Sequence, residues 1–208
     1  MNWTQAGFTL LGQRVLWTDL IGNICALSTV VLAMRRTIWT WPVQLVGSVL
    51  LFVASVEAHI TGNALKQAMF GLLAVYGWVR WVRGTRHGET LPVRPGSGRE
   101  RGALLAVMVA GTALVALFFV ATGWSWAPLP DAYIFVGSAV ATYAQGKALI
   151  DFWWIWIAVD LVGVPLAFSS GLVVSGVVYG IFFVMVLLGI REWRRQYRNT
   201  RRLEVAPI

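Results

Sequence analysis

The residues best suited to bind a small molecule lie in an apolar stretch late in the chain. Trp153, Trp156 and Asp160 are spaced so that, on a helix, their side chains project to a similar face. A carboxylate there can accept hydrogen bonds from a hydroxyl or an amide, and indole rings offer flat surfaces to an aromatic ring. Ionisable side chains are costly inside a bilayer, so this stretch is the first candidate for a substrate site. Alternatively, Asp160 bonds a polar group on a neighbouring helix.

An earlier apolar stretch carries a similar combination. Trp41, Gln44 and Ser48 share the spacing of one helix face, and Pro42 is positioned to loosen the helix near its start. Overlaid at one offset, Gln44-Leu-Val-Gly falls on Asp160-Leu-Val-Gly. Polar residues at matching positions, each near a Trp, are what a transport site between two repeated halves requires.

The matching extends to a second pair of stretches, through Gly77 with Gly189 and Trp81 with Trp193. These matches predict two three-helix units joined by one linking helix. A single linking helix gives both units the same orientation in the membrane, which is the arrangement of parallel-repeat transporters. The alternative is that short motifs recur by chance in apolar sequence of low diversity.

Further polar and aromatic side chains complete the predicted substrate-binding set. The set is Trp153, Trp156, Asp160, Gln44, Trp41, Asn23, Tyr143 and Tyr179. Other inward candidates are Asn63, Gln67, Gln145 and Ser175. For the members outside the two Trp-containing motifs, helix packing or the membrane interface is an equally good explanation.

Motifs for other kinds of chemistry are missing. The chain has no phosphate-binding loop of the Gly-x-x-x-x-Gly-Lys-Ser/Thr type, no His and Cys cluster with metal spacing, and no plausible Ser-His-Asp set. We therefore expect no catalytic residue, no metal and no cofactor, and a protein that is not an enzyme. Because Asp160 is the only carboxylate clearly near the middle of a span, no proton relay is visible, which favours a facilitator over a pump.

The composition places these stretches in a membrane. Hydrophobic residues make up 58% of the 208 residues and charged residues 12%, against roughly 25% charged in an ordinary soluble domain. The formal net charge of +8 would suggest nucleic acid as the partner of a soluble protein. On this apolar background it indicates orientation in a membrane instead, so we expect a lipid bilayer and no nucleic acid.

Seven stretches are long enough to cross a bilayer, for which about 20 mostly apolar residues are needed. They are Leu16–Met34, Ile38–Ala58, Ala64–Val82, Gly102–Gly123, Asp131–Ala148, Phe152–Ser169 and Leu172–Ile190. The prediction is an all-α integral membrane protein in five parts. These are a first three-helix repeat over 16–82, a flexible polar loop over 83–101, a linking helix over 102–123, a second repeat over 131–190 and a basic tail over 191–208.

Basic residues predict the orientation. With seven spans, the arginines after the first span, around the loop 83–101 and in the tail 191–208 lie on one side, and Arg14 and Lys66 lie opposite. The positive-inside rule then puts the N-terminus outside and the C-terminus in the cytoplasm. We interpret the tail as a lipid-facing anchor rather than a nucleic-acid or effector site. Insertion would rely on the first span, without a cleaved signal peptide.

Three motifs and the layout of three, one and three helices resemble one known family. The motifs are Trp153-x-x-Trp156, Asp160-Leu-Val-Gly-Val-Pro165-Leu and Trp41-Pro42-Val43-Gln44. Across essentially the whole chain they resemble the PnuC vitamin transporters. The resemblance implies seven spans in a SWEET-like fold, a homotrimer in the bacterial inner membrane, and facilitated diffusion of an unphosphorylated vitamin precursor that a cytoplasmic kinase traps.

Substrates in that family are nicotinamide riboside, thiamine and riboflavin. An Asn commonly precedes the first Trp of the Trp-x-x-Trp motif in nicotinamide riboside members, and Phe152 stands there in this chain. Residues 38–44, 131–137 and 162–168 look more like the actinobacterial riboflavin branch, RibM or PnuX. The resemblance implies riboflavin uniport by alternating access. Nicotinamide riboside is the alternative, because Asp160 could offset its positive charge.

Rivals from other classes stay open. A substrate-binding subunit that needs an ATP-hydrolysing partner, or a sensor without transport, would bind a vitamin without moving it across a liposome membrane. A membrane enzyme acting on a lipid would normally carry charged or His-rich motifs at a membrane face, where this chain has only arginines that we expect to be solvated.

Overall fold

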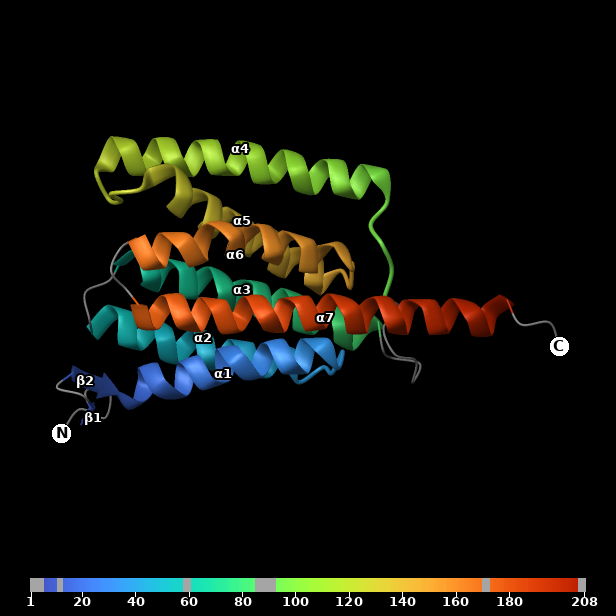
Figure 1. Ribbon diagram of the computed structural model, residues 1–208, viewed down its shortest axis with the longest axis horizontal. Helices are drawn as coiled ribbons and strands as arrows, with labels where there is room; N and C mark the ends of the chain where they lie inside the picture. The colour runs from blue at the N-terminus through green and yellow to red at the C-terminus, as the bar shows by residue number, and fades with distance from the viewer. Residues whose placement is uncertain (1–5, 11–12, 58–60, 85–92, 170–172, 206–208) are drawn as a thin grey trace. The chain divides into compact units, whose positions relative to one another are not determined.

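Apolar runs in this chain form helices because a helix satisfies its own backbone hydrogen bonds, which a bilayer core cannot do. The computed structural model describes residues 6–10, 13–57, 61–84, 93–169 and 173–205. Its described residues form seven α-helices, one at each of the seven stretches (Figure 1). They are α1 (Trp17–Met34), α2 (Thr40–Glu57), α3 (Thr61–Gly84), α4 (Gly98–Thr122), α5 (Pro128–Gly146), α6 (Asp151–Ser169) and α7 (Val173–Val205).

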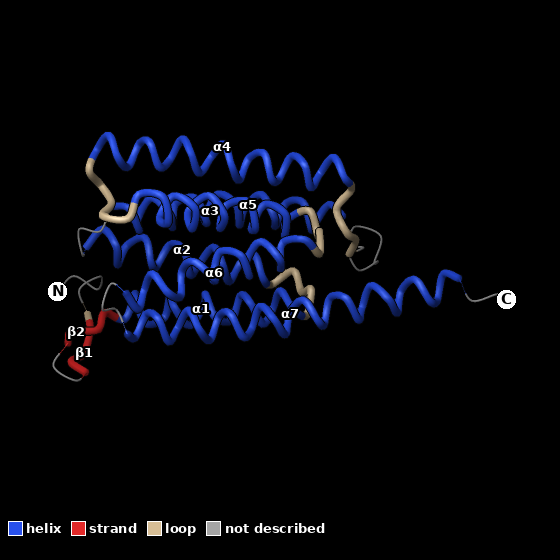
Figure 2. Tube along the Cα trace, turned by 45° about the horizontal axis from the view of Figure 1, so that its top comes forward, coloured by secondary structure: helices blue, strands red, loops and turns tan. Residues whose placement is uncertain are grey.

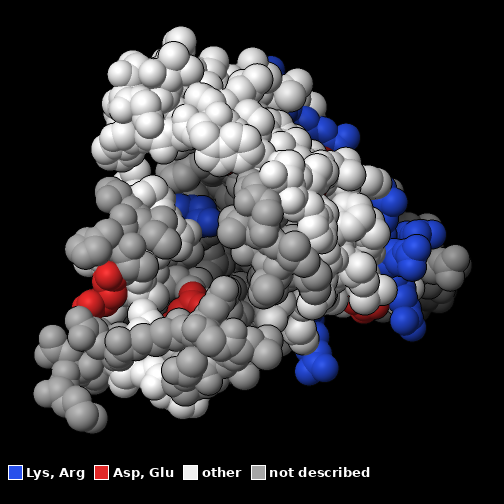
Figure 3. Space-filling view, turned by 60° about the vertical axis from the view of Figure 1, so that its left-hand side comes forward, with Lys and Arg blue, Asp and Glu red and all other residues white. Residues whose placement is uncertain are grey.

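The helices have the surface of a membrane protein. Among the described residues, α1, α2 and α4 are each long and apolar enough by themselves to cross a membrane. Many large hydrophobic side chains are exposed, Leu105, Leu114 and Leu117 of α4 among them. Uncharged residues also cover most of the described surface seen in Figure 3. Such a surface is stable in contact with lipid tails and costly in contact with water.

The chain divides into two units, Met1–Arg83 and Gly84–Ile208. In the first unit α1 packs along α2. In the second unit α5 packs against both α4 and α6, and α6 packs against α7. The helix expected to link the two repeats is therefore joined to the second unit by its side chains as well as by the chain.

Three boundaries differ from the sequence prediction. The polar segment before the linking helix is shorter than 83–101, because α3 continues to Gly84 and α4 begins at Gly98. A capping box starts α4: the amide of Glu100 donates to the Ser97 hydroxyl, and the Ser97 amide donates to the Glu100 carboxylate. The last helix does not end at Ile190 but continues to Val205, since the basic tail is rich in helix-favouring Arg and contains no Gly or Pro before that point.

A short β-hairpin precedes α1 and was not expected. Strands β1 (Gly7–Leu10) and β2 (Gln13–Leu16) pair antiparallel, with Gly7 opposite Leu16, and lead directly into α1 (Figure 2). The signal in the sequence is a short connection that contains Gly12, between two short segments. The prominent apolar run that follows hides this signal.

Candidate substrate-binding site

Two helix-to-helix turns, one in each unit, have the same backbone geometry. Arg36 and Ala148 are the described non-glycine residues with a positive φ, and both have a φ of 54°. The hydrogen bonds around them also match. In the first turn the amides of Arg36, Thr37 and Trp41 donate to the carbonyls of Ala33, Leu32 and Ile38, respectively. In the second turn the amides of Ala148, Leu149 and Trp153 donate to the carbonyls of Gln145, Ala144 and Ile150, respectively. The alignment that places Arg36 on Ala148 therefore relates α1 and α2 to α5 and α6. We call this alignment the repeat register.

A tryptophan seated against a glycine follows each turn. Trp41 of α2 is 0% exposed, and a methyl group on Gly77 of α3 would collide with its ring. The edge of one indole meets the face of another at Trp81, with ring centroids 5.4 Å apart. Only glycine at position 77 leaves room for this ring, so the Gly-Trp spacing that the sequence repeats is a packing motif.

The second unit repeats the motif with Trp153 of α6, which is 1% exposed. A methyl group on Gly189 of α7 would collide with its ring, and Trp193 meets it edge to face at 5.9 Å. Phe152 covers it further, with ring centroids 4.3 Å apart. Because protein covers the rings of Trp41 and Trp153, their burial favours a packing role over the predicted contact with substrate.

The repeat register changes the alignment of the polar residues. It pairs Trp41 with Trp153, and therefore Ser48 with Asp160 and Gln44 with Trp156. The overlay of Gln44 on Asp160 is too far along the chain by about one helical turn. Such an overlay keeps each side chain near the same face, so helical periodicity cannot distinguish it from the repeat register.

Asp160 is the most unusual of the predicted residues. It lies in the middle of α6 and is 3% exposed, and no described side chain or backbone group bonds its Oδ2. Its partner in the repeat, Ser48, is also buried, but the Ser48 hydroxyl donates to the carbonyl of Leu45 at 2.9 Å. A buried carboxylate oxygen without a hydrogen bond is costly, so Asp160 is ready to accept one from a ligand.

Two further members of the predicted set lie on the same pair of helices as Asp160, α6 and α7. Trp156 is one helical turn before Asp160 on α6 and is partly exposed. Gly163, on the same face of α6, lies beside Tyr179 of α7: a Cβ built on Gly163 would be 3.8 Å from the Tyr179 ring. Trp156, Asp160 and Tyr179 thus supply an indole, a carboxylate and a phenol along the α6–α7 pair.

The other predicted residues have different surroundings, each within its own unit. Asn23 is exposed and donates to the backbone carbonyl and the carboxylate of Asp19 on its own helix, at 2.9 and 3.0 Å. Tyr143 is exposed at the end of α5, its ring 6.0 Å from the ammonium of Lys147. Gln44 is partly exposed on α2.

Of the remaining inward candidates, Gln67 and Gln145 are buried, and Asn63 donates to the Ser55 hydroxyl at 2.6 Å. The Ser175 side chain and Arg14 side chain lie outside the described residues. In the part of the chain that the structure describes, no group of three His, Cys, Asp or Glu could hold a metal ion.

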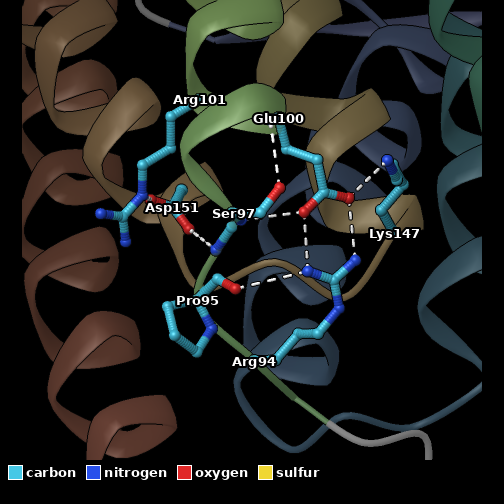
Figure 4. A network of polar contacts seen from close by, with 8 residues as sticks. Arg94, Pro95, Ser97, Glu100, Arg101, Lys147 and Asp151 are labelled. Atoms are coloured by element: carbon cyan, nitrogen blue, oxygen red, sulfur yellow. Dashed lines mark hydrogen bonds and ion pairs between the residues drawn. The ribbon is translucent and has the colours of Figure 1, made fainter.

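A cluster of charges at the start of α4 engages two of the arginines that we expected to be only solvated, Arg94 and Arg101 (Figure 4). Residues 85–92 of the expected flexible loop lie outside the described residues. The Glu100 carboxylate accepts from Arg94 at 2.7 and 2.8 Å and pairs with Lys147 at 2.7 Å. The Arg101 guanidinium pairs with Asp151 at 2.7 Å. The hydrogen bond to Glu100 raises the pKa of Arg94 above its usual value. We call these five residues the α4 clamp.

Backbone hydrogen bonds complete the clamp. The amide of Arg94 donates to the carbonyl of Ala148, the amide of Ile150 donates to the carbonyl of Arg94, and that of Gly96 donates to Asp151. The clamp therefore fastens the start of α4 to the α5–α6 turn. Ser97-x-x-Glu100 is a local signal of the helix start that the sequence analysis passed over.

Comparison with known proteins identifies the class: the chain is a multi-pass membrane transporter. Residues 16–195 match the family model described as nicotinamide mononucleotide transporter, and the chain belongs to this family, which includes PnuC. The predictions of a PnuC-family transporter with an all-helical fold, and of a protein that is not an enzyme, are confirmed.

Three known proteins show what this chain is similar to within the family. It is 46% identical to the riboflavin/roseoflavin transporter RibM of Streptomyces davaonensis, over 100% of both chains. It is 23% identical to the nicotinamide riboside transporter PnuC of Escherichia coli, over 90% of this chain and 89% of that one. A crystal structure of the vitamin B3 transporter PnuC has the same fold, with a TM-score of 0.70 and 19% identity, covering 88% of this chain and 83% of the other.

Proposed function

We propose that this protein carries riboflavin across the bacterial inner membrane by facilitated diffusion. The observation that carries the proposal is the full-length identity of 46% to a protein named as a riboflavin/roseoflavin transporter, twice the 23% to one named for nicotinamide riboside. The substrate site opens to one side of the membrane at a time. Net uptake needs no coupling ion, because a cytoplasmic kinase phosphorylates the vitamin and traps it.

The group along α6 and α7 suits this substrate. Riboflavin has a neutral, flat three-ring system and a polyhydroxyl chain. The partly exposed indole of Trp156 can stack on the rings, and Asp160 can accept a hydrogen bond from the ring imide or from a chain hydroxyl. Tyr179 adds a hydroxyl that donates or accepts. Trp41 and Trp153 are left out of this assignment because protein covers them.

Orientation and assembly are part of the same proposal. Exposed basic residues, which include Arg35, Arg83 and Arg194, support a cytoplasmic C-terminus and an external N-terminus by the positive-inside rule. The family resemblance supports a homotrimer. In this orientation the α4 clamp faces the cytoplasm.

The experiment is uptake of labelled riboflavin into proteoliposomes that contain only this protein. We expect saturable uptake without ATP or an ion gradient, and faster entry when the vesicles are preloaded with unlabelled riboflavin, because exchange is a property of a uniporter. Empty vesicles and vesicles with the Asp160→Asn protein are the controls. Saturable binding with no flux would instead support the partner-dependent subunit or the sensor.

A second candidate substrate is nicotinamide riboside. The observation that favours it is the buried Asp160 oxygen without a described partner, since an anionic carboxylate can offset a pyridinium charge. Competition separates the two: an excess of nicotinamide riboside should leave riboflavin exchange unchanged if riboflavin is the substrate. Saturable uptake of labelled nicotinamide riboside, with no riboflavin uptake, would reverse the assignment while keeping the transport mechanism.

A further inference from the structure

The final part of α7 presents a stripe of arginines on one face of the helix. Arg191, Arg194, Arg195 and Arg198 are all exposed, and their spacing of three and four positions keeps them together on one face. The residues between them face the other way: Trp193 is buried, and Gln196 donates to Glu192 at 2.8 Å. We call these four arginines the arginine stripe. Its charges are thus separated from Glu192, the carboxylate within this segment.

The stripe begins where the apolar part of α7 ends. The run from Val173 to Ile190 would be about 27 Å long at 1.5 Å per residue, close to the roughly 30 Å of a hydrocarbon core. Arg191 to Arg195 then rise through about 6 Å, and Arg198 lies about 12 Å beyond Ile190. The polar headgroup layer on each side of a bilayer is about 5 to 8 Å thick. The first three arginines therefore reach the depth of the phosphates, which a soluble partner does not.

An exposed tryptophan accompanies the stripe. Trp154, near the start of α6, is 49% exposed, and the guanidinium carbon of Arg194 lies 4.9 Å from the centroid of its ring. Stacking on an indole fixes a guanidinium while leaving its outer N–H groups able to bond to an anion. Trp at the edge of a membrane span also prefers the headgroup level. Arg194 is therefore already held at the headgroup level before an anionic lipid binds.

The first unit shows that the fold does not require this arrangement. In the repeat register, Pro42 and Val82 correspond to Trp154 and Arg194, and Val79 corresponds to Arg191. The first unit keeps the packed Gly-Trp motif but has apolar residues at these three positions. Arg195 and Arg198 have basic counterparts in the sequence, Arg83 and Arg86. The addition to the shared framework is therefore Arg191 and Arg194 together with Trp154.

We infer that the arginine stripe and Trp154 form a binding surface for the phosphate headgroup of anionic phospholipids. The charges of Arg191, Arg194 and Arg195 match the phosphates, and they stand at phosphate depth beside an interfacial indole. Each basic residue near an anionic membrane surface contributes roughly fivefold in affinity, or about 1 kcal/mol.

The test is lipid selectivity of the full-length protein in phosphatidylcholine bilayers with a few per cent of spin-labelled lipid. The fraction of label immobilised by the protein is compared for phosphatidylglycerol and phosphatidylcholine. We expect a several-fold preference for phosphatidylglycerol in the wild type. The triple variant Arg191→Gln, Arg194→Gln, Arg195→Gln should bring the ratio to within about twofold of one. Trp154→Leu should lower it by a smaller factor.

A matched control variant separates a site from bulk charge. Arg80→Gln, Arg83→Gln, Arg99→Gln removes the same number of exposed arginines outside the stripe. It should keep most of the preference, and inorganic phosphate should not displace the bound lipid. The inference is overturned if the control loses as much selectivity as the stripe variant, if the stripe variant keeps the wild-type ratio, or if soluble phosphate displaces the lipid. All replaced residues are exposed, and an unchanged melting temperature in phosphatidylcholine checks their folding.

Discussion

The α1–α2 turn and the α5–α6 turn have the same backbone geometry but different surroundings. In the second unit, Ala148, Leu149 and Ile150 are buried beneath the α4 clamp. In the first unit, Arg35 is exposed and Trp39 is 65% exposed. The same φ and the same hydrogen bonds form in both settings, so the turn does not depend on the cover that the clamp provides. The clamp serves another purpose, which is to hold the linking helix.

The same contrast applies to the residues that follow the turns. Both units bury a tryptophan against a glycine. At the matched position seven residues after that tryptophan, one unit has the hydroxyl of Ser48 and the other has the carboxylate of Asp160. The Ser48 hydroxyl donates a hydrogen bond to a backbone carbonyl of its own helix, whereas no described group bonds the Asp160 Oδ2 atom. Framework positions are shared between the two units, whereas the position to which we assign binding chemistry is not.

The largest effects should come from the shared framework. Gly77→Ala and Gly189→Ala each push a methyl group into a tryptophan ring that has nowhere to move. We expect a loss of about 3 kcal/mol or more in each unit, seen as little folded protein and a much lower melting temperature in detergent. The matched controls are Gly62→Ala in α3 and Gly180→Ala in α7, where nothing lies within 4 Å of the new methyl. A stable Gly189→Ala protein beside an unstable Gly77→Ala protein would show that the two motifs are not equivalent.

Asp160→Asn and Ser48→Ala compare the two positions that differ. Asp160→Asn should weaken riboflavin binding at least tenfold, or about 1.4 kcal/mol, since the charged acceptor is lost while the shape is kept. Ser48→Ala should leave binding within about twofold, because its hydroxyl is already bonded within α2. Quenching of tryptophan fluorescence by riboflavin, corrected for its absorbance, measures both. Equal losses at the two positions would contradict the assignment of binding chemistry to one unit.

Glu100→Gln tests the clamp, because it removes the negative charge that pairs with both Arg94 and Lys147 while one acceptor oxygen stays. We expect a drop in melting temperature clearly smaller than that of the glycine variants, since these charges are partly solvated. The drop should shrink in about 1 M salt, where surface charges are screened. Arg99→Gln, on the same turn of α4, should have no effect. A drop that is independent of salt would contradict an electrostatic role for Glu100 in the clamp.

The smallest effects should come from the positive-φ residues themselves. A non-glycine residue in this region costs about 1 to 2 kcal/mol, which glycine relieves. Arg36→Gly should therefore stabilise the protein by about 1 kcal/mol. Ala148→Gly should change little, because losing a buried methyl costs about 0.8 kcal/mol and offsets the gain. Melting curves in detergent distinguish the two, and a larger gain at Ala148 would contradict the importance of its burial.

Much of this framework could be predicted from the sequence. Hydropathy located each helix, because a bilayer allows little else. The Gly77–Trp81 and Gly189–Trp193 spacings pointed to a repeat for which packing gives the reason. The register of the polar residues could not be found in the same way. A slip of about one helical turn, from Ser48 to Gln44, preserves the helix face and therefore the pattern.

The clamp and the buried tryptophans were harder to predict for a different reason. Arg101 and Asp151 are 50 residues apart, so their pairing depends on how the helices pack and leaves no local pattern. Trp153 and Trp156 lie on one helix and look equivalent in sequence. Gly189, Trp193 and Phe152 surround Trp153 and make it a core residue, whereas Trp156 is partly exposed.

The cover over the α5–α6 turn has a consequence for the lifetime of individual backbone hydrogens. The amide of Ile150 is bonded to Arg94 beneath a closed layer of protein, so its exchange with deuterium waits for the start of α4 to detach. Ile38, at the matching place in the first unit, is half-buried in an exposed turn, and its exchange requires only a local fluctuation. The same backbone shape thus has two amide exchange rates, and the slower one, at Ile150, measures how often the start of α4 detaches.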